Sequence, residues 1–497
     1  MITRRTAVKG LIGGGLATSG LFGQWRSAPA FAASPGPLIV PSLIKGEVRD
    51  GVRVFDLTLQ RGISRFFEGV ETPTLGINAA YLGPTLQMRA GETVRINVTN
   101  RIGEPSTLHW HGLHLPASAD GGPHQIIAPE ATWSPQFKVK QRASMFWYHS
   151  HMAPRTGPQV YQGLAGLMYV SDDETDRLDL PGEYGIDDLP LIIQDRAFNR
   201  DGSFYYSASM HNLMMGMQGD TLLTNGGVFP YFEAKTNTLR LRILNGSNAR
   251  FYNLGFSDGR RFHQIGSDGG LLERPHESDR LMLAPGERVQ MVVDLSDGQP
   301  VVLRGFPVPN TGMMGPGMMG RGMMGRSMMG DDITFDVLEI RPHGQRVRSA
   351  PLPTRLISLD RIDASEAIRT RRFTLEMGMG GMMMGGGFTI NGKTMDLARI
   401  DEKVRVGTTE IWEIENVSPM PHPFHVHDVQ FRILDRNGSP PQPGERGLKD
   451  TVIVSPRERV RLLLGFADYS DPDSPYMYHC HNLEHEDAGM MGQFVVV

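Results

Sequence analysis

One strand-like pattern recurs three times in this 497-residue chain and leaves few folds open to it. Each copy alternates apolar and polar residues and stops at an asparagine, in the segments 91–100, 236–245 and 407–416. Alternation with a period of two, ended by a turn former, is typical of a half-buried strand. A second strand-like stretch follows each copy, at 128–140, 284–295 and 455–466. Paired strand signals that recur about every 150 residues predict three copies of one β-sandwich domain.

The domains are expected at residues 34–175, 184–345 and 350–497, with the acidic segment 171–179 as the first linker. Amphipathic helical stretches are scarce, so the predicted fold class is all-β. The formal net charge of -4 argues against nucleic-acid binding, which favours a basic face.

Residues 1–33 have the composition of an export signal. Thr3-Arg4-Arg5 opens the segment, an apolar, glycine-rich stretch covers 11–23, and small residues close it at 30–33. The apolar stretch is shorter than the about 20 residues that span a bilayer. Paired arginines indicate a twin-arginine signal peptide and the twin-arginine translocase as an export partner. We therefore expect a periplasmic mature chain without a membrane span, and we expect it to be a monomer.

Ten of the 16 histidines gather in four short clusters, all of them in the first and third repeats. The clusters are His109-Trp-His111, His149-Ser-His151, His422-Pro-Phe-His425-Val-His427, and His479-Cys480-His481 with His485. At the matching places the second repeat has Asn245-Gly-Ser-Asn248 and Arg304-Gly-Phe. The first and third domains therefore each offer two His-x-His pairs, and the second offers none.

The spacing of the pairs indicates metal binding. Residues i and i+2 of a strand point to the same face, about 6.6 Å apart, which suits two neighbouring ions better than one. Four pairs supply eight imidazoles, enough for a compact group of copper ions between two domains. Zinc is disfavoured, because its structural sites take four ligands each and it has no redox chemistry.

Cys480 is the single cysteine of the chain and lies between two of these histidines, so its side chain points to the opposite face. With His422 and His485 it forms a set of two imidazoles and one thiolate. Met490 is available as a weak axial ligand. This set is the composition of a blue, electron-transferring copper site.

These motifs, in this order, resemble the signatures of the multicopper oxidases, and most closely those of bacterial periplasmic copper efflux oxidases. The resemblance implies three cupredoxin-like Greek-key β-sandwiches, dioxygen as the electron acceptor, and four copper ions. It assigns type 1 copper to His422, Cys480, His485 and Met490, and type 2 copper to His109 and His425. It assigns one type 3 copper to His111, His149 and His481, and the other to His151, His427 and His479.

Two acidic residues match acids that these relatives place near the oxygen channel. They are Asp120, in Asp-Gly-Gly after the first histidine pair, and Glu486, next to His485. We predict that both relay protons, because reduction of dioxygen to water consumes protons as well as electrons. The alternative for Asp120 is that it initiates a turn before Gly121-Gly122.

The 29 methionines are concentrated in the segments 210–217, 313–329 and 377–384. The interleaved glycines argue against a packed core and predict loops. Thioethers are soft ligands that suit Cu(I), which indicates Cu(I) as the substrate. By resemblance, an additional substrate copper would take Met377 and Met420, with Glu376 as a replacement acid. Ser418 and Met382 stand where such relatives carry acidic residues.

Three readings of the function remain open. The first is a cuprous oxidase that protects the periplasm, and the second is a laccase-like oxidase of small phenols. The third is a copper-buffering or chaperone protein without turnover, which the complete ligand set argues against. A copper nitrite reductase is a distant fourth, since that class lacks so many His-x-His pairs.

Overall fold

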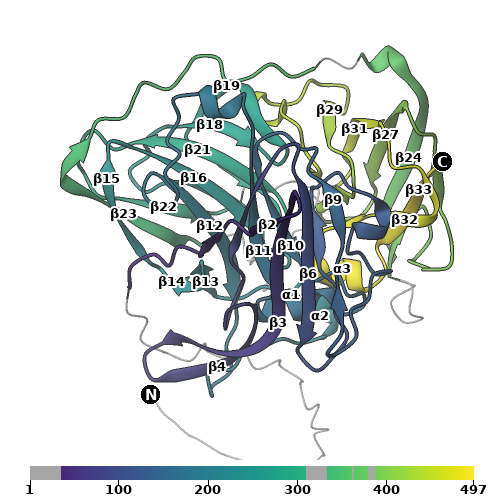
Figure 1. Ribbon diagram of the computed structural model, residues 1–497, viewed down its shortest axis with the longest axis horizontal. Coiled ribbons are helices and arrows are strands. Elements are labelled where there is room, and N and C mark those ends of the chain that lie inside the picture. The colour runs from purple at the N-terminus through teal and green to yellow at the C-terminus, as the bar shows by residue number, and fades with distance from the viewer. Residues whose placement is uncertain (1–34, 309–332, 361–362, 379–386) are drawn as a thin grey trace, which may run out of the picture.

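The computed structural model describes residues 35–308, 333–360, 363–378 and 387–497. The predicted export signal and the methionine-rich segment 313–329 lie outside these residues, as does most of segment 377–384. Figure 1 shows three lobes, with teal strands of the second on the left, yellow and green strands of the third on the right, and the first between them in this view.

The first lobe is a sandwich of two sheets. One sheet has the order β2 (Glu47–Arg49), β3 (Val52–Phe67), β6 (Thr93–Arg101), β8 (Thr132–Trp133), with β4 (Val70–Ile77) on β3 and β9 (Gln136–Lys138) on β6. The other has the order β1 (Leu43–Ile44), β5 (Thr85–Arg89), β11 (Ala165–Ser171), β10 (Ser144–His149), β7 (His109–His111).

The second lobe repeats this arrangement with a larger first sheet. That sheet has the order β14 (Gly227–Val228), β13 (Thr221–Thr224), β12 (Asp188–Arg196), β16 (Thr238–Asn245), β21 (Arg288–Asp294), β18 (Phe262–Ser267), β19 (Gly270–Ser278). The facing sheet has the order β15 (Tyr231–Thr236), β23 (Phe335–Val347), β22 (Val301–Phe306), β17 (Tyr252–Phe256), β20 (Leu281–Leu283).

The third lobe contains two five-stranded sheets. One has the order β25 (Phe388–Ile390), β24 (Ala367–Met377), β27 (Thr408–Asn416), β31 (Arg459–Phe466), β29 (Phe431–Arg436). The other has the order β26 (Glu402–Val404), β33 (Met491–Val496), β32 (Asp471–Cys480), β28 (His422–Val426), β30 (Thr451–Val454). The all-β fold class predicted from the sequence is confirmed, and the exact domain boundaries stay predictions.

The recurring sequence pattern corresponds to equivalent strands in the three sandwiches, namely β6, β16 and β27. Each pairs in parallel with a preceding long strand and antiparallel with a strand of the second predicted set, which are β9, β21 and β31.

The asparagine that ends each copy has the same task in all three sandwiches. Its side-chain NH₂ donates to two backbone carbonyls at 2.7 to 2.9 Å, and its amide oxygen accepts from the backbone N–H two residues ahead. These residues are Asn100, Asn245 and Asn416, all fully buried. Their hydrogen bonds satisfy buried carbonyls where the strand ladder stops, which explains why the pattern ends at this residue type.

Each sandwich encloses its own apolar core, formed by the inward-facing residues of its two sheets. In the third sandwich Trp412 packs on Phe373 with ring centroids 4.6 Å apart, and both side chains are fully buried. Truncating such a residue to alanine typically costs about 3–5 kcal/mol of stability. A further apolar cluster, including Trp147, Leu167 and Leu244, joins the first sandwich to the second.

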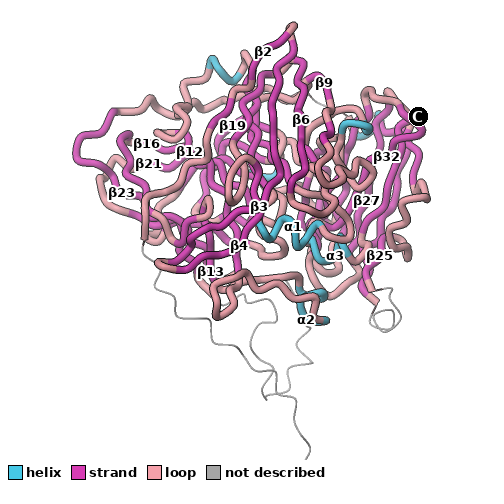
Figure 2. Tube along the Cα trace, turned by 60° about the horizontal axis from the view of Figure 1, so that its bottom comes forward, coloured by secondary structure: helices cyan, strands magenta, loops and turns pink. Residues whose placement is uncertain are grey.

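Helices are few and short: α1 (Thr156–Gln162), α2 (Met210–Met215) and α3 (Leu483–Asp487). Figure 2 shows α1 next to α3, with α2 nearby on the same side of the molecule. Among the described residues, no helix has the length and apolar character needed to cross a membrane. The three helices come from three different sandwiches, so they mark the place where all three meet.

Candidate metal centre

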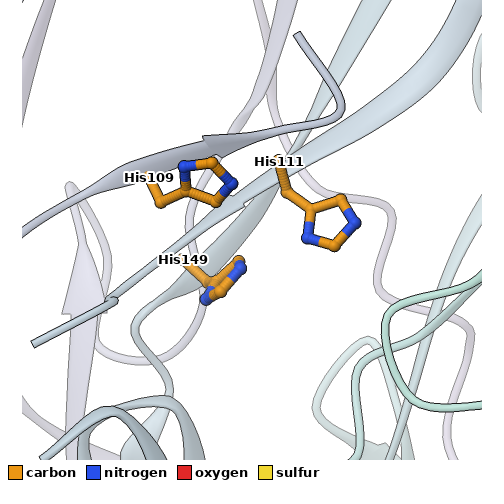
Figure 3. A group of neighbouring side chains, drawn as sticks. All are labelled: His109, His111 and His149. Atoms are coloured by element: carbon orange, nitrogen blue, oxygen red, sulfur yellow. The ribbon is translucent and has the colours of Figure 1, made fainter. Parts of the chain in front are cut away.

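The four His-x-His pairs are brought together by strand register. In the first sandwich, β7 pairs antiparallel with β10 so that His109 lies opposite His149. In the third, β28 pairs with β32 so that His425 lies opposite His479. Figure 3 shows the rings of His109, His111 and His149 turned toward a common space. Antiparallel pairing thus converts two distant sequence clusters into one donor set in each of these sandwiches.

The two donor sets face each other across the seam between the first and third sandwiches. The His109 and His427 rings stack with centroids 3.9 Å apart, and the His111 and His425 rings stack at 3.7 Å. His479 Nε2 lies 3.2 Å from His151 Nε2. All eight imidazoles are buried.

Protein acceptors fix the orientation of most of these rings. The Nδ1 atoms of His109, His149, His425 and His479 lie 2.8 to 3.1 Å from backbone carbonyl oxygens. Because a carbonyl can only accept, Nδ1 carries the hydrogen and Nε2 keeps its lone pair. His111 is reversed, since its Nε2 lies 3.0 Å from Asp450 Oδ1.

The opposite nitrogens remain available for a ligand. Within the part of the chain that the structure describes, four of them have no hydrogen-bond partner: His109 Nε2, His111 Nδ1, His149 Nε2 and His425 Nε2. Neither ring nitrogen of His481 has one either. A buried polar atom without a partner is costly, so this number of unpartnered lone pairs in one place is the expected arrangement of a metal site.

Neutral rings are the metal-binding form of histidine, and the site favours them. Burial first, and neighbouring imidazoles second, lower the pKa of His427 to about 4, although Asp120 opposes this shift, and burial with neighbouring imidazoles lowers the pKa of His481 to about 3. Burial, followed by neighbouring imidazoles, also lowers the pKa of His111, His149, His151, His425 and His479. The rings therefore offer lone pairs rather than positive charges.

The structure groups the predicted ligands closely. His151, His427 and His479 have donor atoms within 4.8 Å of one another, as do His109, His425 and His427. His111 and His149 form a third such group together with His109. His481 belongs to none of these groups, and its ring centroid lies 5.0 Å from that of His111.

Cys480 lies on the other face of β32 and has its own set of partners. Its Sγ is 3.4 Å from His422 Nδ1 and 3.6 Å from His485 Nδ1. Met490 is fully buried, and its carbonyl accepts a hydrogen bond from the Cys480 N–H at 3.0 Å. Burial raises the pKa of the Cys480 thiol, so a metal ion that binds here must displace a proton.

The outer nitrogens of the two imidazoles in this second set are both occupied. His422 Nε2 lies 2.7 Å from Ser418 Oγ, and His485 Nε2 lies 3.0 Å from the Met214 carbonyl oxygen. The Phe388 ring stacks on His485 with centroids 4.2 Å apart. Two imidazoles, one sulfur and a nearby thioether match the ligand preferences of copper better than those of zinc or magnesium.

The two predicted proton-relay acids both contact imidazoles of the seam. Asp120 Oδ2 lies 2.7 Å from His427 Nδ1, and Glu486 lies 3.3 Å from His151 Nδ1 and 3.2 Å from His479 Nδ1. Burial alone would raise the pKa of Asp120, but the neighbouring His427 and His109 rings lower it.

The predicted substrate-copper residues all belong to the third sandwich, and their role in a metal site stays a prediction. Met377 packs against the core of the third sandwich, and Met420 is buried beside His422. Glu376 precedes Met377 on β24, so their side chains point to opposite faces. The Glu376 carboxylate accepts hydrogen bonds from Thr389 Oγ1 and the Gly392 N–H at 2.9 and 2.8 Å.

The site contains two residues that the sequence analysis did not identify. Asp450 contacts His111 and also forms a bidentate ion pair with Arg288 of the second sandwich, both contacts at 2.6 Å. Both side chains are fully buried. The signal was present in the sequence, because each is a charged residue at the start of an apolar stretch, Arg288-Val and Asp450-Thr-Val-Ile-Val.

Comparisons with known proteins agree with this geometry. Two family models, both described as "Multicopper oxidase", match residues 58–175 and 369–497. The chain is 37% identical to multicopper oxidase mco of Staphylococcus aureus, over 90% of this chain and 89% of that protein. It is 36% identical to cell division protein FtsP of Salmonella typhimurium, over 94% of this chain and 93% of that protein.

Solved structures give the same result. A bacterial laccase-like multi-copper oxidase, CueO from Ochrobactrum sp., superposes with a TM-score of 0.84 at 36% identity, covering 93% of this chain and 100% of that chain. A multicopper oxidase from Campylobacter jejuni, titled a metallo-oxidase, gives a TM-score of 0.80 at 28% identity, covering 94% and 96%.

Proposed function

Because this chain belongs to the multicopper oxidase family, we propose that it couples the one-electron oxidation of Cu(I) to Cu(II) to the four-electron reduction of dioxygen to water. The observation that carries the proposal is the seam, where eight buried imidazoles from two sandwiches present lone pairs to one another next to the single cysteine. Because relatives named as cell division proteins are also similar to this chain, the proposal depends on these donors rather than on family membership alone.

We assign four copper ions to these residues. Type 1 copper is held by His422, Cys480, His485 and Met490, and type 2 copper by His109 and His425. The type 3 pair is held by His111, His149 and His481 on one ion, and by His151, His427 and His479 on the other. When bound, the copper ions supply one-electron transfer and the reduction of dioxygen.

The chain itself joins the two donor sets and excludes water. Cys480 shares peptide bonds with His479 and His481, so a short covalent path connects the thiolate to both ends of the seam. Full burial keeps the seam dry, and stacked rings hold the two sandwiches in register. Asp120 and Glu486, which contact four of the imidazoles, are the residues we assign to holding protons there.

Cu(I) as the substrate is supported by thioethers near the Cys480 site. Met420 lies two residues before His422, and Met377 packs on the same core as Cys480. Soft thioethers favour Cu(I) over harder cations. The alternative substrate is a small phenol, which the laccase-like structural relative suggests; a copper-buffering role would leave the imidazole seam without a purpose.

The proposed location depends on the predicted signal peptide, residues 1–33. We propose export through the twin-arginine route and removal of residues 1–33, which leaves a periplasmic monomer of three domains at 34–175, 184–345 and 350–497. The arginine pair Arg4-Arg5 supports this route, and these residues lie outside the described part of the chain.

The test is oxygen uptake by copper-loaded protein, with Cu(I) and with a phenol, compared with Cys480→Ser. We expect the wild type to consume oxygen with Cu(I). We expect Cys480→Ser to lose its visible colour and both activities, because the thiolate lies on the proposed electron path from the substrate to the imidazole seam. Turnover that persists in Cys480→Ser contradicts the assigned electron path, and a wild type that binds copper without oxygen uptake supports buffering instead.

A further inference from the structure

The outer edge of His485 is covered by a methionine-rich helix from another domain. His485 Nε2 donates to the Met214 carbonyl oxygen at 3.0 Å. Met214 belongs to α2, which lies in the segment that joins β12 to β13 in the second sandwich. An electron donor that approaches His485 from this side meets α2 first.

A buried carboxylate also ties this segment to α3. Glu484, which is 6% exposed, directly precedes His485 on α3. Its Oε1 accepts from the Tyr206 hydroxyl at 2.9 Å and its Oε2 from the Met217 N–H at 2.8 Å. The segment is therefore tied to α3 on both sides of α2, which fixes the helix over the imidazole.

The methionines of the segment divide into structural and available ones. Met217 is 1% exposed, and its sulfur accepts a hydrogen bond from Asn212 Nδ2 at 3.2 Å, so it serves packing. Leu213 turns inward against the core of the third sandwich. Met210 is 51% exposed, while Met214 and Met215 are half-buried. These three thioethers are not committed to a core.

Helical spacing places the available donors beside one another. Residues four apart on a helix are neighbours, about 5–6 Å between Cβ atoms, so Met210 lies next to Met214 and the exposed His211 lies next to Met215. Three thioethers and one imidazole thus form a compact group along α2. Thioethers select soft monovalent ions, and imidazole binds copper readily.

We propose that Met210, His211, Met214 and Met215 bind substrate Cu(I), and that the electron passes inward along the hydrogen bond from the Met214 carbonyl to His485. This site rests on the proposed function but is separate from Met377 and Met420, which belong to the third sandwich. Each Cu(I) loses one electron and leaves as Cu(II). Four such electrons and four protons convert one dioxygen molecule into two waters, so the reaction balances.

The test uses Ag(I), which shares the charge and softness of Cu(I) but does not donate an electron under these conditions. Ag(I) is titrated into copper-loaded protein while the visible band of the copper at Cys480 is recorded. We expect Ag(I) to shift this band in the wild type, because the backbone carbonyl of its ligand Met214 accepts the hydrogen bond from His485. We expect no shift in a variant with Met210→Leu, Met214→Leu and Met215→Leu, whose band before titration matches that of the wild type.

Two controls keep the result specific. Met282→Leu removes one half-buried thioether elsewhere in the second sandwich and should leave the Ag(I) shift intact. A milder variant, His211→Gln with Met215→Leu, should weaken Ag(I) binding even if the triple variant folds poorly. In steady state the triple variant should raise the KM for Cu(I) about tenfold and leave phenol turnover unchanged or faster.

The outcomes separate the site from the activity. A band shift that survives in both α2 variants, or its absence in the wild type, overturns the site even if Cu(I) oxidation is normal. A shift that the α2 variants lose, in a wild type that consumes no oxygen with Cu(I), supports the site as a soft-cation site and contradicts the proposed function alone.

Discussion

The second sandwich has the same strand scaffold as the first and third but is used differently. Asn245 ends β16 with the same set of hydrogen bonds that Asn100 and Asn416 make at the ends of β6 and β27. After that residue the first and third sandwiches continue into histidine pairs. The second continues into Ser247 and Asn248, and none of its described residues belongs to the imidazole seam.

The comparison shows how duties are divided within one repeated fold. The first and third sandwiches provide imidazole lone pairs, and the second provides a charged side chain that contacts the seam and a helix that covers the Cys480 site. Its Arg288 neutralises Asp450, the residue that orients His111, and its α2 covers His485. Three copies of a sandwich can therefore share strand positions while their loops and strand ends diverge.

The largest effect is expected from Arg288→Met, which breaks the contact between the second sandwich and the seam. Removing one partner of a buried pair leaves an uncompensated charge on Asp450 and costs about 3–5 kcal/mol. We also expect reduced copper content, because Asp450 no longer holds His111 in place. Denaturant unfolding and elemental analysis measure the two effects.

The matched control is Arg242→Met, which breaks another buried bidentate pair in the second sandwich, with Asp188. It should destabilise the protein while leaving the copper content of the folded fraction unchanged. Equal copper loss in both variants would mean that the second sandwich acts on the seam through general stability rather than through Asp450.

Removal of copper should destabilise the first and third sandwiches more than the second. A ligand that binds the folded state at 1,000 times its Kd stabilises it by about 4.1 kcal/mol. We expect a chelator to speed amide hydrogen exchange in β7, β10, β28 and β32 more than in β17 and β22, the corresponding strands of the second sandwich. Uniform acceleration in all three sandwiches would indicate that they unfold as one unit.

The shared asparagine offers a smaller comparison. Asn245→Ala and Asn416→Ala each remove two side-chain hydrogen bonds to backbone carbonyls, which costs about 1–3 kcal/mol. We expect similar losses of stability in both variants, measured by denaturant unfolding. Asn416→Ala should also shift the visible band of the copper at Cys480, because Asn416 holds the loop whose Ser418 contacts His422. A shift of equal size in Asn245→Ala would argue against this local connection.

The smallest effect concerns a pH-dependent contact across the same seam, outside the metal ligands. His114 Nδ1 lies 2.7 Å from Asp428 and Nε2 lies 2.6 Å from Asp468, and the ring also packs on Tyr469. Burial opposes protonation, but the two carboxylates more than offset it and raise the pKa of His114. A raised pKa in the folded state stabilises fully below about pH 6.5, and this stability is lost as the pH rises through the folded-state pKa.

We therefore expect His114→Gln to cost up to about 1 kcal/mol at pH 6 and little at pH 9, by denaturant unfolding. Lys140→Gln is the control, because the Lys140 ion pair with Asp468 does not titrate in this window. A difference between wild type and His114→Gln that grows with pH contradicts the assignment.

Much of the fold was predictable because its determinants are local. Period-two alternation ended by asparagine located β6, β16 and β27, and the histidine clusters located the residues that line the seam. Local patterns failed where contacts are long-range. Arg288 and Asp450 are 162 residues apart, and Met214 and His485 are 271 apart, so no spacing rule joins them. For Glu376 the strand alternation places its side chain on the face opposite to Met377, and its role in a substrate-copper site stays a prediction.

The stacked rings across the seam also set the order of assembly during synthesis. His109 and His427 form one stack and His111 and His425 another, yet each pair is separated by more than half of the chain. The first sandwich must therefore wait, with its imidazoles exposed, until nearly the last residues have left the ribosome. Metal loading at this seam therefore has to follow synthesis of the third sandwich.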